Sequence, residues 1–309
     1  MRLAALAALL LSGGGRLSFA GPPPAHPLVA LAPPASPNDD ARRAVAVGPH
    51  GEVYAPDGKG AWVRRLPATT ADRLSLAGRA GAAVVASGEG GVYRLADNGW
   101  SAARLTQKGQ AIMSSGPSAV AAVGRQVFAL DRNVSGEPAK LALAPTPVLA
   151  IGAGRSIVIA TDRGLYRIAG TKTTRLERAP RRVTRLVSDV WALVDRGAVD
   201  LRTNTTTPWP AGLIIHVAAV GPADSLVAVG SSRAGLELLT LRAGKLTRAP
   251  ITLTPTGVPV GVAVDRAGRA VVALRDGRLA VRDHAAWSTV TVDEQPGAEK
   301  PGAPPATTP

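Results

Sequence analysis

The sequence contains no cysteine, which excludes disulfides, thiolate metal sites, a cysteine nucleophile and a lipid-modified N-terminal cysteine. Only 3% of its residues are aromatic, which predicts a core built mostly of Val, Leu, Ile and Ala. Histidine occurs only four times, at His26, His50, His216 and His284. With so few histidines we find no plausible Ser/His/Asp set and no cluster at metal-ligand spacing.

The sequence has no apolar run long enough to span a membrane, and its main apolar run lies near the N-terminus. Leu3–Leu11 follows the positive Arg2 and is far too short to span a bilayer. Small residues at Ser18 and Ala20 form a cleavage site before Gly21. Residues 1–20 therefore predict a signal peptide, and the mature protein is expected in the periplasm or outside the cell. An uncleaved apolar N-terminal helix is the alternative.

Acidic residues are outnumbered, and the formal net charge is +14. Such a balance suits an anionic polysaccharide, an anionic membrane surface or nucleic acid. The arginines are scattered along the chain, however, and the abundance of Ala, Gly, Pro and Arg is typical of GC-rich codons. We expect no nucleic-acid partner, no transmembrane segment and a monomer, while a solvated basic surface without function is the alternative for the charge.

Proline divides the chain into a folded body and two ends. Residues 21–40 read GPPPAHPLVALAPPASPNDD, which predicts a Pro-rich linker or exposed arm in which Leu28–Ala32 could add as an edge strand. The tail over residues 294–309 has little to bury and is expected to be disordered. The folded body is predicted over residues 41–293.

Within this body a hairpin pattern recurs. AAVVASGEGGVYRL, ending at Leu95, aligns without a gap with SIVIATDRGLYRI, ending at Ile168. Each has an apolar run, a polar turn, a glycine and a second apolar run. The glycine can be followed through seven units with a mean spacing of about 36 residues, at Gly60, Gly91, Gly124, Gly164, Gly197, Gly235 and Gly277.

Each unit also has apolar runs before and after the hairpin, which makes four short strands rich in β-branched residues. No ten-residue window outside the signal peptide has helical periodicity. Four antiparallel strands repeated seven times predict an all-β fold, a single β-propeller of about seven four-stranded blades over 41–293. An open β-solenoid or two β-sandwiches are the alternatives, and the sequence leaves open which strand closes the ring.

One repeat resembles that of two-component-regulator propellers, a sensor-type family. The matching residues are Thr161, Asp162, Gly164, Leu165, Tyr166 and Arg167, with an echo in VVASGEGGVYRL at Val84–Leu95. The match covers about a third of each unit and is clean in two of the seven. The resemblance implies a sensor or ligand-binding propeller outside the cytoplasm, without catalysis of its own.

Side chains for chemistry are mostly missing. His216 lies in the apolar run LIIHVAAV and is expected to be a packed core histidine rather than a ligand. Asp162, Asp195 and Asp276 recur at the hairpin turn, where a carboxylate can cap turn amides. We expect no cofactor, no metal and no enzymatic activity. The alternatives are a metal-dependent propeller lyase or lactonase and a periplasmic envelope-assembly factor.

The remaining prediction concerns where a partner binds. In a four-stranded blade, the turn between strands two and three lies on the same face as the connection to the next blade. Arginines in two such turns and in the connection between them should therefore share one face, and arginine forks suit carboxylate or phosphate. We predict a weak anion-binding sector for a protein, an anionic glycan or a small ligand, made of Arg163, Arg178, Arg181, Arg182 and Arg196.

Overall fold

The structure is a computed structural model that describes residues 26–293, apart from 37, 58, 60, 67–69, 71–72, 81, 90, 97–98, 103–110, 115–118, 131–137, 171, 178–179, 181, 254–256 and 284–285. Its regular elements are β-strands and two three-residue 3-10 helices, η1 (Ala41–Arg43) and η2 (Pro222–Asp224). The predicted signal peptide, the predicted tail and His284 lie outside the described residues.

The strands follow one another in groups of four along the chain. The first two groups are β1 (Ala30–Ala32), β2 (Val45–Val47), β3 (Val53–Pro56), β4 (Trp62–Leu66), β5 (Leu74–Ala80), β6 (Ala83–Gly88), β7 (Gly91–Ala96) and β8 (Gly99–Ala102). The next two are β9 (Ala111–Met113), β10 (Val120–Val123), β11 (Gln126–Ala129), β12 (Lys140–Leu143), β13 (Ala150–Ala153), β14 (Ile157–Thr161), β15 (Gly164–Ala169) and β16 (Lys172–Arg175).

The second half of the chain continues the pattern. It contains β17 (Arg185–Leu186), β18 (Trp191–Val194), β19 (Gly197–Asp200), β20 (Thr205–Pro208), β21 (Ile214–Val220), β22 (Leu226–Ser232), β23 (Gly235–Arg242) and β24 (Lys245–Ile251). The last group is β25 (Pro259–Val264), β26 (Ala270–Leu274), β27 (Arg278–Asp283) and β28 (Ala286–Asp293).

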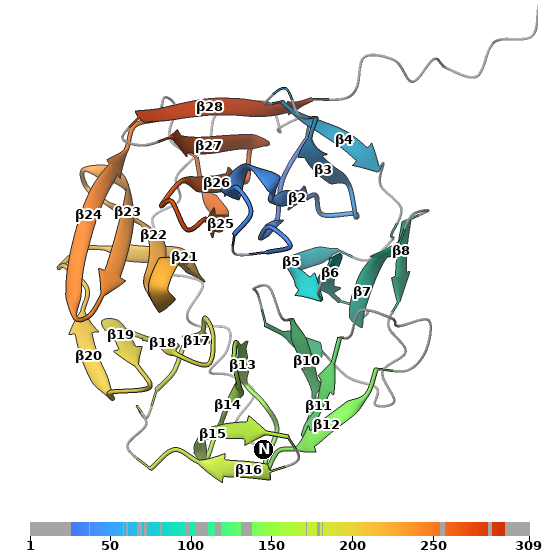
Figure 1. Cartoon of the computed structure of the whole chain (residues 1–309), viewed down its shortest axis with the longest axis vertical. Helices are drawn as coiled ribbons and strands as arrows, with labels where there is room; N and C mark the ends of the chain where they lie inside the picture. Colours follow the sequence, from blue (N-terminus) through green and yellow to red (C-terminus); the bar gives the residue numbers. More distant parts are fainter. Residues whose placement is uncertain are drawn as a thin grey trace, which may run out of the picture.

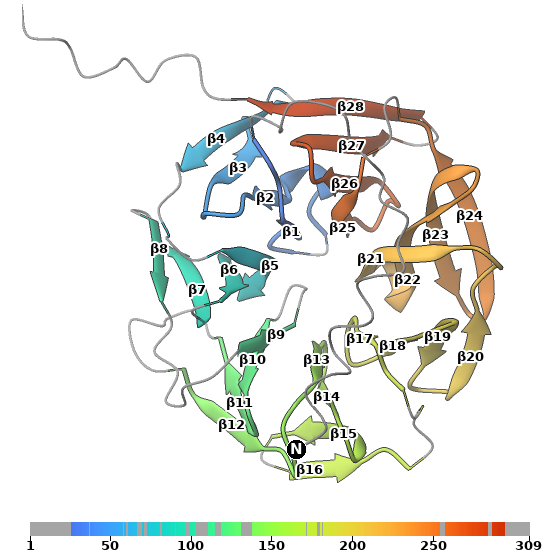
Figure 2. The same cartoon turned by 180° about the vertical axis from the view of Figure 1, so that it is seen from behind.

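The groups are arranged as a ring (Figure 1). In each group the first strand lies nearest the centre of the ring and the fourth lies at the outside, as the view from behind also shows (Figure 2). Within a group, neighbours in sequence pair in antiparallel fashion. The all-β propeller fold is therefore confirmed.

The predicted count of about seven separate blades is wrong. Five sheets are separate four-stranded blades, and the other eight strands form one sheet in the order β1-β2-β3-β4-β28-β27-β26-β25. The cause is the length of β28, which runs past the end of β27. Its last residues pair in parallel with β4, Val292 with Trp62 and Asp293 with Val63, so the first and last groups join at their outer strands.

The structure also corrects the predicted linker. Leu28 is fully buried, and β1, at Ala30–Ala32, is a buried strand rather than an exposed arm. It is the terminal strand of its sheet, as the edge-strand alternative expected. The backbone amide of Leu28 donates to the carbonyl of Arg275, which ties this segment to the last group. The prolines on both sides of the apolar stretch hid it, because they are typical of linkers. The folded ring therefore begins before residue 41.

The glycine register is confirmed for four of the seven units. Gly91, Gly164, Gly197 and Gly235 each open the third strand of their group. Gly124 and Gly277 lie in the turn just before that strand. Gly60 lies outside the described residues, and in its group the turn between the second and third strands carries Gly51, whose φ is +87°.

Buried apolar side chains lie between adjacent groups of strands, so the core is divided around the ring. Most of them are Ala, Val, Leu and Ile, as the composition predicts, and the few aromatic side chains buried among them are Trp62, Tyr54, Phe128, Trp191 and Tyr93. No helix among the residues described is long and apolar enough to cross a membrane.

Candidate functional site

One face of the ring carries two kinds of loop, and we call it the turn face. These are the turns between second and third strands, and the connections from each fourth strand to the next group. The Val148 amide of one connection donates to the carbonyl of Gly124 in such a turn. The Trp209 amide of another donates to the carbonyl of Arg196. The two kinds of loop therefore lie against each other, as the sector prediction requires.

Three of the five arginines predicted to bind anions are described, and all three are exposed on the turn face. Arg163 lies in the β14–β15 turn, Arg196 in the β18–β19 turn and Arg182 in the β16–β17 connection. None of the three forms an ion pair with another described residue. Arg178 and Arg181 lie outside the described residues.

The recurrent aspartates of these turns do not share one role. Asp162 accepts a hydrogen bond from the hydroxyl of Thr146, at 2.5 Å between the oxygens. Asp276 accepts from the amide of Arg278 at 3.3 Å and from its guanidinium at 2.6 Å. Only Asp276 therefore caps a turn amide as predicted, and its charge is already paired with Arg278.

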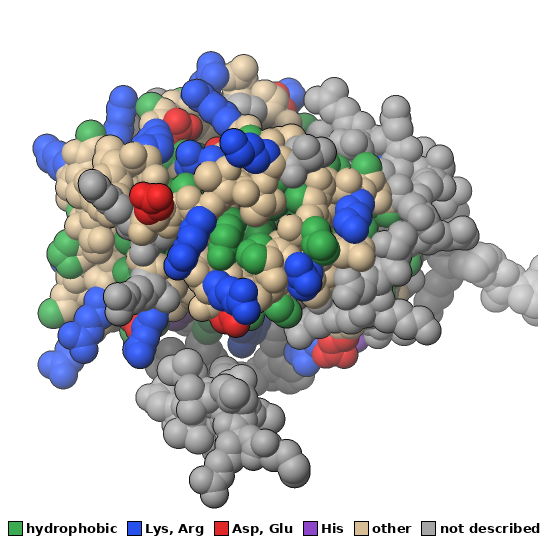
Figure 3. Space-filling view, turned by 90° about the horizontal axis from the view of Figure 1, so that it is seen from below, with side chains coloured by type: hydrophobic (Ala, Val, Ile, Leu, Met, Phe, Trp, Pro, Cys, Tyr) green, Lys and Arg blue, Asp and Glu red, His purple; other side chains and the backbone are tan. Residues whose placement is uncertain are grey.

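The side wall of the ring carries many basic side chains, but they are not gathered in one patch. In the view from below, onto the part of the ring where β16 lies, Lys and Arg side chains are spread over the wall and acidic ones are fewer (Figure 3). Such a spread fits a solvated surface, so the net charge alone does not locate a site.

A large hollow opens on the turn face away from the predicted sector. It has a volume of about 570 Å³ and is bordered by the entry to β1, the start of β5 and the β6–β7 turn. Arg73, Glu89 and Arg275 are its charged lining residues, and all three are exposed. None of them is ion-paired within the described parts of the chain. We call this hollow the turn-face cavity.

Sequence reasoning missed Arg73 and Arg275. Both lie in loops of the kinds that the sector prediction used, a connection and a turn between second and third strands. The run of arginines before β17 placed the predicted site on the other side of the ring. Which loops meet around a ring depends on the angular order of the groups, and a local pattern does not contain that order.

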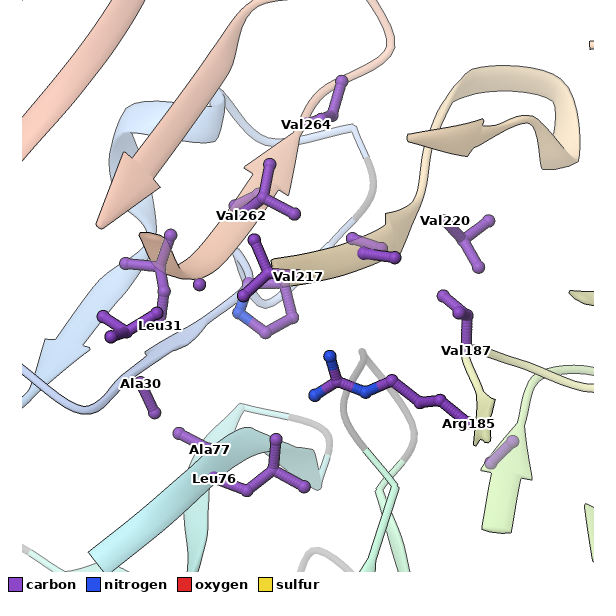
Figure 4. A pocket seen from close by; sticks show the side chains of 17 residues that line it. Ala30, Leu31, Leu76, Ala77, Arg185, Val187, Val217, Val220, Val262 and Val264 are labelled. Atoms are coloured by element: carbon purple, nitrogen blue, oxygen red, sulfur yellow. The ribbon is translucent and has the colours of Figure 1, made fainter. Parts of the chain in front are cut away.

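A second cavity lies deeper, in the central channel. Its volume is about 80 Å³, and its walls come from the first strands of six groups, β1, β5, β13, β17, β21 and β25. All lining side chains are apolar except that of Arg185, which extends from β17 into the cavity (Figure 4). Val260 lines this channel cavity and the turn-face cavity alike.

Arg185 is the unusual residue of the channel. Its side chain is half-buried, and this burial lowers the pKa of its guanidinium. An arginine remains charged at neutral pH even so. Within the described residues no hydrogen bond or ion pair joins Arg185 to the protein.

His216, predicted to be a packed core histidine, is half-buried in the structure. It lies in β21 at a point where the pairing with β22 shifts register, and its Nε2 is 2.7 Å from the hydroxyl of Ser231. Burial lowers the pKa of its imidazole. Across the described ranges, no group of three or more His, Asp or Glu side chains could hold a metal ion.

The fold defines the class of protein: this chain is a β-propeller. No family model matches it, and no curated protein matches it. Solved structures do. YCF48 from Cyanidioschyzon merolae is similar with a TM-score of 0.58 and 16% identity, over 84% of this chain and 96% of that chain.

Two further structures show the same likeness. The WD40 β-propeller domain of Doa1 has a TM-score of 0.56 and 13% identity, over 85% of this chain and 95% of that one. A streptogramin B lyase structure has a TM-score of 0.57 and 13% identity, over 82% and 92%. Such low identities establish the shared fold and nothing about activity.

Proposed function

We propose that this propeller is an exported, non-catalytic binding module, of the sensor or scaffold type, that takes an anionic group of its partner on the turn face. The observation that carries the proposal is the turn-face cavity. Its volume of about 570 Å³ lies in the range of about 300–1,000 Å³ that is usual for ligand sites. Arg73 and Arg275 line it, exposed and without an ion-pair partner in the described structure.

The arginines on the far side of the ring also favour the turn face as the binding face. Arg163, Arg182 and Arg196 are exposed there, and no described carboxylate is paired with them. Guanidinium groups bind carboxylate or phosphate oxygens through two parallel hydrogen bonds. A large partner on the turn face could therefore meet two basic regions, one at the cavity and one on the far side of the channel.

The test is retention on an anionic, heparin-like matrix, read as the salt concentration of elution. One variant combines Arg73→Ala with Arg275→Ala, and a second combines Arg178→Ala, Arg181→Ala and Arg182→Ala. The matched control combines Arg242→Ala with Lys245→Ala. These two cations flank the β23–β24 turn, which topology places on the opposite face, and both are exposed.

Both turn-face variants should elute at lower salt than the control, because charges at a binding face contribute more than charges elsewhere. If the shifts follow only the number of cations removed, which is two, three and two, net charge alone matters and the proposal is wrong. Pull-down from envelope extracts then separates a protein partner, as an assembly factor would have, from a glycan or a soluble ligand.

A metal-dependent lyase or lactonase is the second candidate. It rests on the likeness of fold to streptogramin B lyase alone. Metal analysis of the purified protein distinguishes the two. A catalytic metal is held by several converging side chains and stays bound during purification. Divalent metal bound in a one-to-one ratio would therefore contradict the non-catalytic proposal.

A further inference from the structure

The channel cavity is a second candidate binding site, because it contains a single charged side chain. Propeller channels are lined by first strands, and here those strands contribute almost only aliphatic side chains. Arg185 is the one charged lining residue, and no lining residue carries a carboxylate. The cavity is therefore apolar with one fixed positive charge.

Leaving a charge in such a place is unfavourable. A charge shielded from water is stabilised by a partner of opposite charge or by a full set of hydrogen bonds. Arg185 is half-buried and has no such partner among the residues described. Ala77, Leu76 and Val217, which line the same cavity, offer no polar side-chain atom (Figure 4). No residue that lines the cavity supplies a counter-charge for this guanidinium.

We propose that the central channel binds a small monocarboxylate, with its carboxylate on the guanidinium of Arg185 and its aliphatic part against the first strands. This site is separate from the turn face and goes beyond the function proposed above. The planar guanidinium fork matches the two oxygens of a carboxylate. A single cation neutralises a monoanion, whereas a phosphate dianion would leave an uncompensated negative charge in an apolar cavity.

The size of the cavity limits the ligand. One water molecule needs about 10–15 Å³ of cavity volume, so a cavity of about 80 Å³ has room for an anion of a few heavy atoms. The walls provide the apolar contacts through Leu31, Val187 and Val262. A short-chain carboxylate such as propionate satisfies the charge, the shape and the size together.

The channel cavity and the turn-face cavity adjoin each other. Val260, near the start of β25, lines both the channel cavity and the turn-face cavity. Arg73 and Arg275 border the outer cavity and would attract anions toward it.

The experiment measures propionate binding to the whole protein by calorimetry and by the shift of Tm. Propionamide serves as the neutral analogue, and chloride and phosphate are compared at equal ionic strength. The test variant is Arg185→Met, which keeps the length and apolar stem of the side chain. The matched control is Arg163→Met, which removes an exposed cation.

Propionate should bind the wild type and Arg163→Met alike, and bind Arg185→Met roughly ten- to a hundredfold more weakly, because a charge-assisted hydrogen bond is lost. Propionamide should not bind measurably. Equal binding to the wild type and Arg185→Met, or no propionate binding, would overturn the proposal. Tighter binding of phosphate or chloride would overturn the carboxylate assignment.

Two more variants keep the test decisive. If Arg185→Met does not fold, Arg185→Lys keeps the charge and loses the fork. It should bind propionate severalfold more weakly, and unchanged affinity would contradict the two-point geometry. The double variant Arg73→Ala with Arg275→Ala should retain equilibrium propionate binding. Failure of the turn-face proposal is thereby distinguished from failure of this one.

Discussion

Val292, near the end of β28, pairs in parallel with Trp62 of β4, and both side chains are buried in one cluster. Every other strand pair in the described structure is antiparallel. This pairing covers part of the outer edge of β4, which would otherwise expose unpaired backbone groups. It also joins the first and last groups of the chain, so the two ends of the ring hold each other.

Truncating Val292 should therefore weaken the ring at its closure. We expect Val292→Ala to lower the free energy of unfolding by about 1–3 kcal/mol, because a fully buried side chain leaves a cavity. The measurement is chemical denaturation. Thr291→Ala, at an exposed neighbour on the same strand, should stay within about 0.5 kcal/mol of the wild type. Equal effects of the two changes would show that the closure carries no stability of its own.

Gly164 opens β15 with a φ of +124°, a backbone conformation that side chains with a Cβ avoid. We expect Gly164→Val to cost more than about 1 kcal/mol of stability. Space is not the reason, because the nearest atom to an added Cβ would be Arg175 Nε at 3.7 Å. Ala169→Val, at the exposed end of the same strand, is the control for added bulk. An unchanged Tm for Gly164→Val would make the glycine register an accident of composition.

Glu237 on β23 depends on Arg248 of the neighbouring strand. Arg248 Nε donates to Glu237 Oε2 at 2.6 Å, and Ser232 donates to Oε1 at 2.7 Å. The hydrogen bond from Arg248 is the main cause that lowers the pKa of Glu237. Removing the guanidinium leaves a shielded carboxylate without its charged partner.

We therefore expect Arg248→Met to lower the Tm at pH 7 more than Lys245→Met, which removes an exposed cation from the same strand. The difference should vanish in acid. A carboxyl whose pKa is lowered in the folded state stabilises the fold above its ordinary pKa of about 4.3, and this contribution is lost as the pH falls further. A difference that persists with Glu237 protonated would assign the effect to packing.

His216 should make stability depend on pH near neutrality. Burial lowers the pKa of its imidazole below the ordinary value of about 6.5. The unfolded chain then binds a proton that the folded protein does not, so stability falls as the pH drops below about 6.5. The Tm of His216→Gln should fall less steeply than that of the wild type over this range. Parallel profiles would mean that the imidazole titrates alike in both states.

The local pattern was enough to predict the strands and their turns. Gly91, Gly164, Gly197 and Gly235 open third strands because a tight turn favours a residue without a Cβ, or a close approach of backbone, at that point. The same turns recur in every group, so repetition makes them visible. Where repetition fails, as at Leu28–Ala32 between prolines, the sequence predicts a linker and leaves the strand β1 as an option only.

The candidate sites were harder to predict, because they depend on contacts across the ring. Arg185 is one arginine in VTRLVS, and nothing in those letters distinguishes it from an exposed one. Its position in the channel follows from the convergence of six first strands. Arg73 and Arg275 are about two hundred residues apart in the sequence, yet they border one cavity because the first and last groups are neighbours in a closed ring.

The sequence by itself determined the class of secondary structure, the repeat and the makeup of the core. Each of these is set by neighbours within one or two strands. The tertiary structure decided the number of separate sheets, the closure through Val292 and Trp62, and the surroundings of Arg185. Ring closure sets all three, because it brings together strand edges and side chains that no local pattern relates.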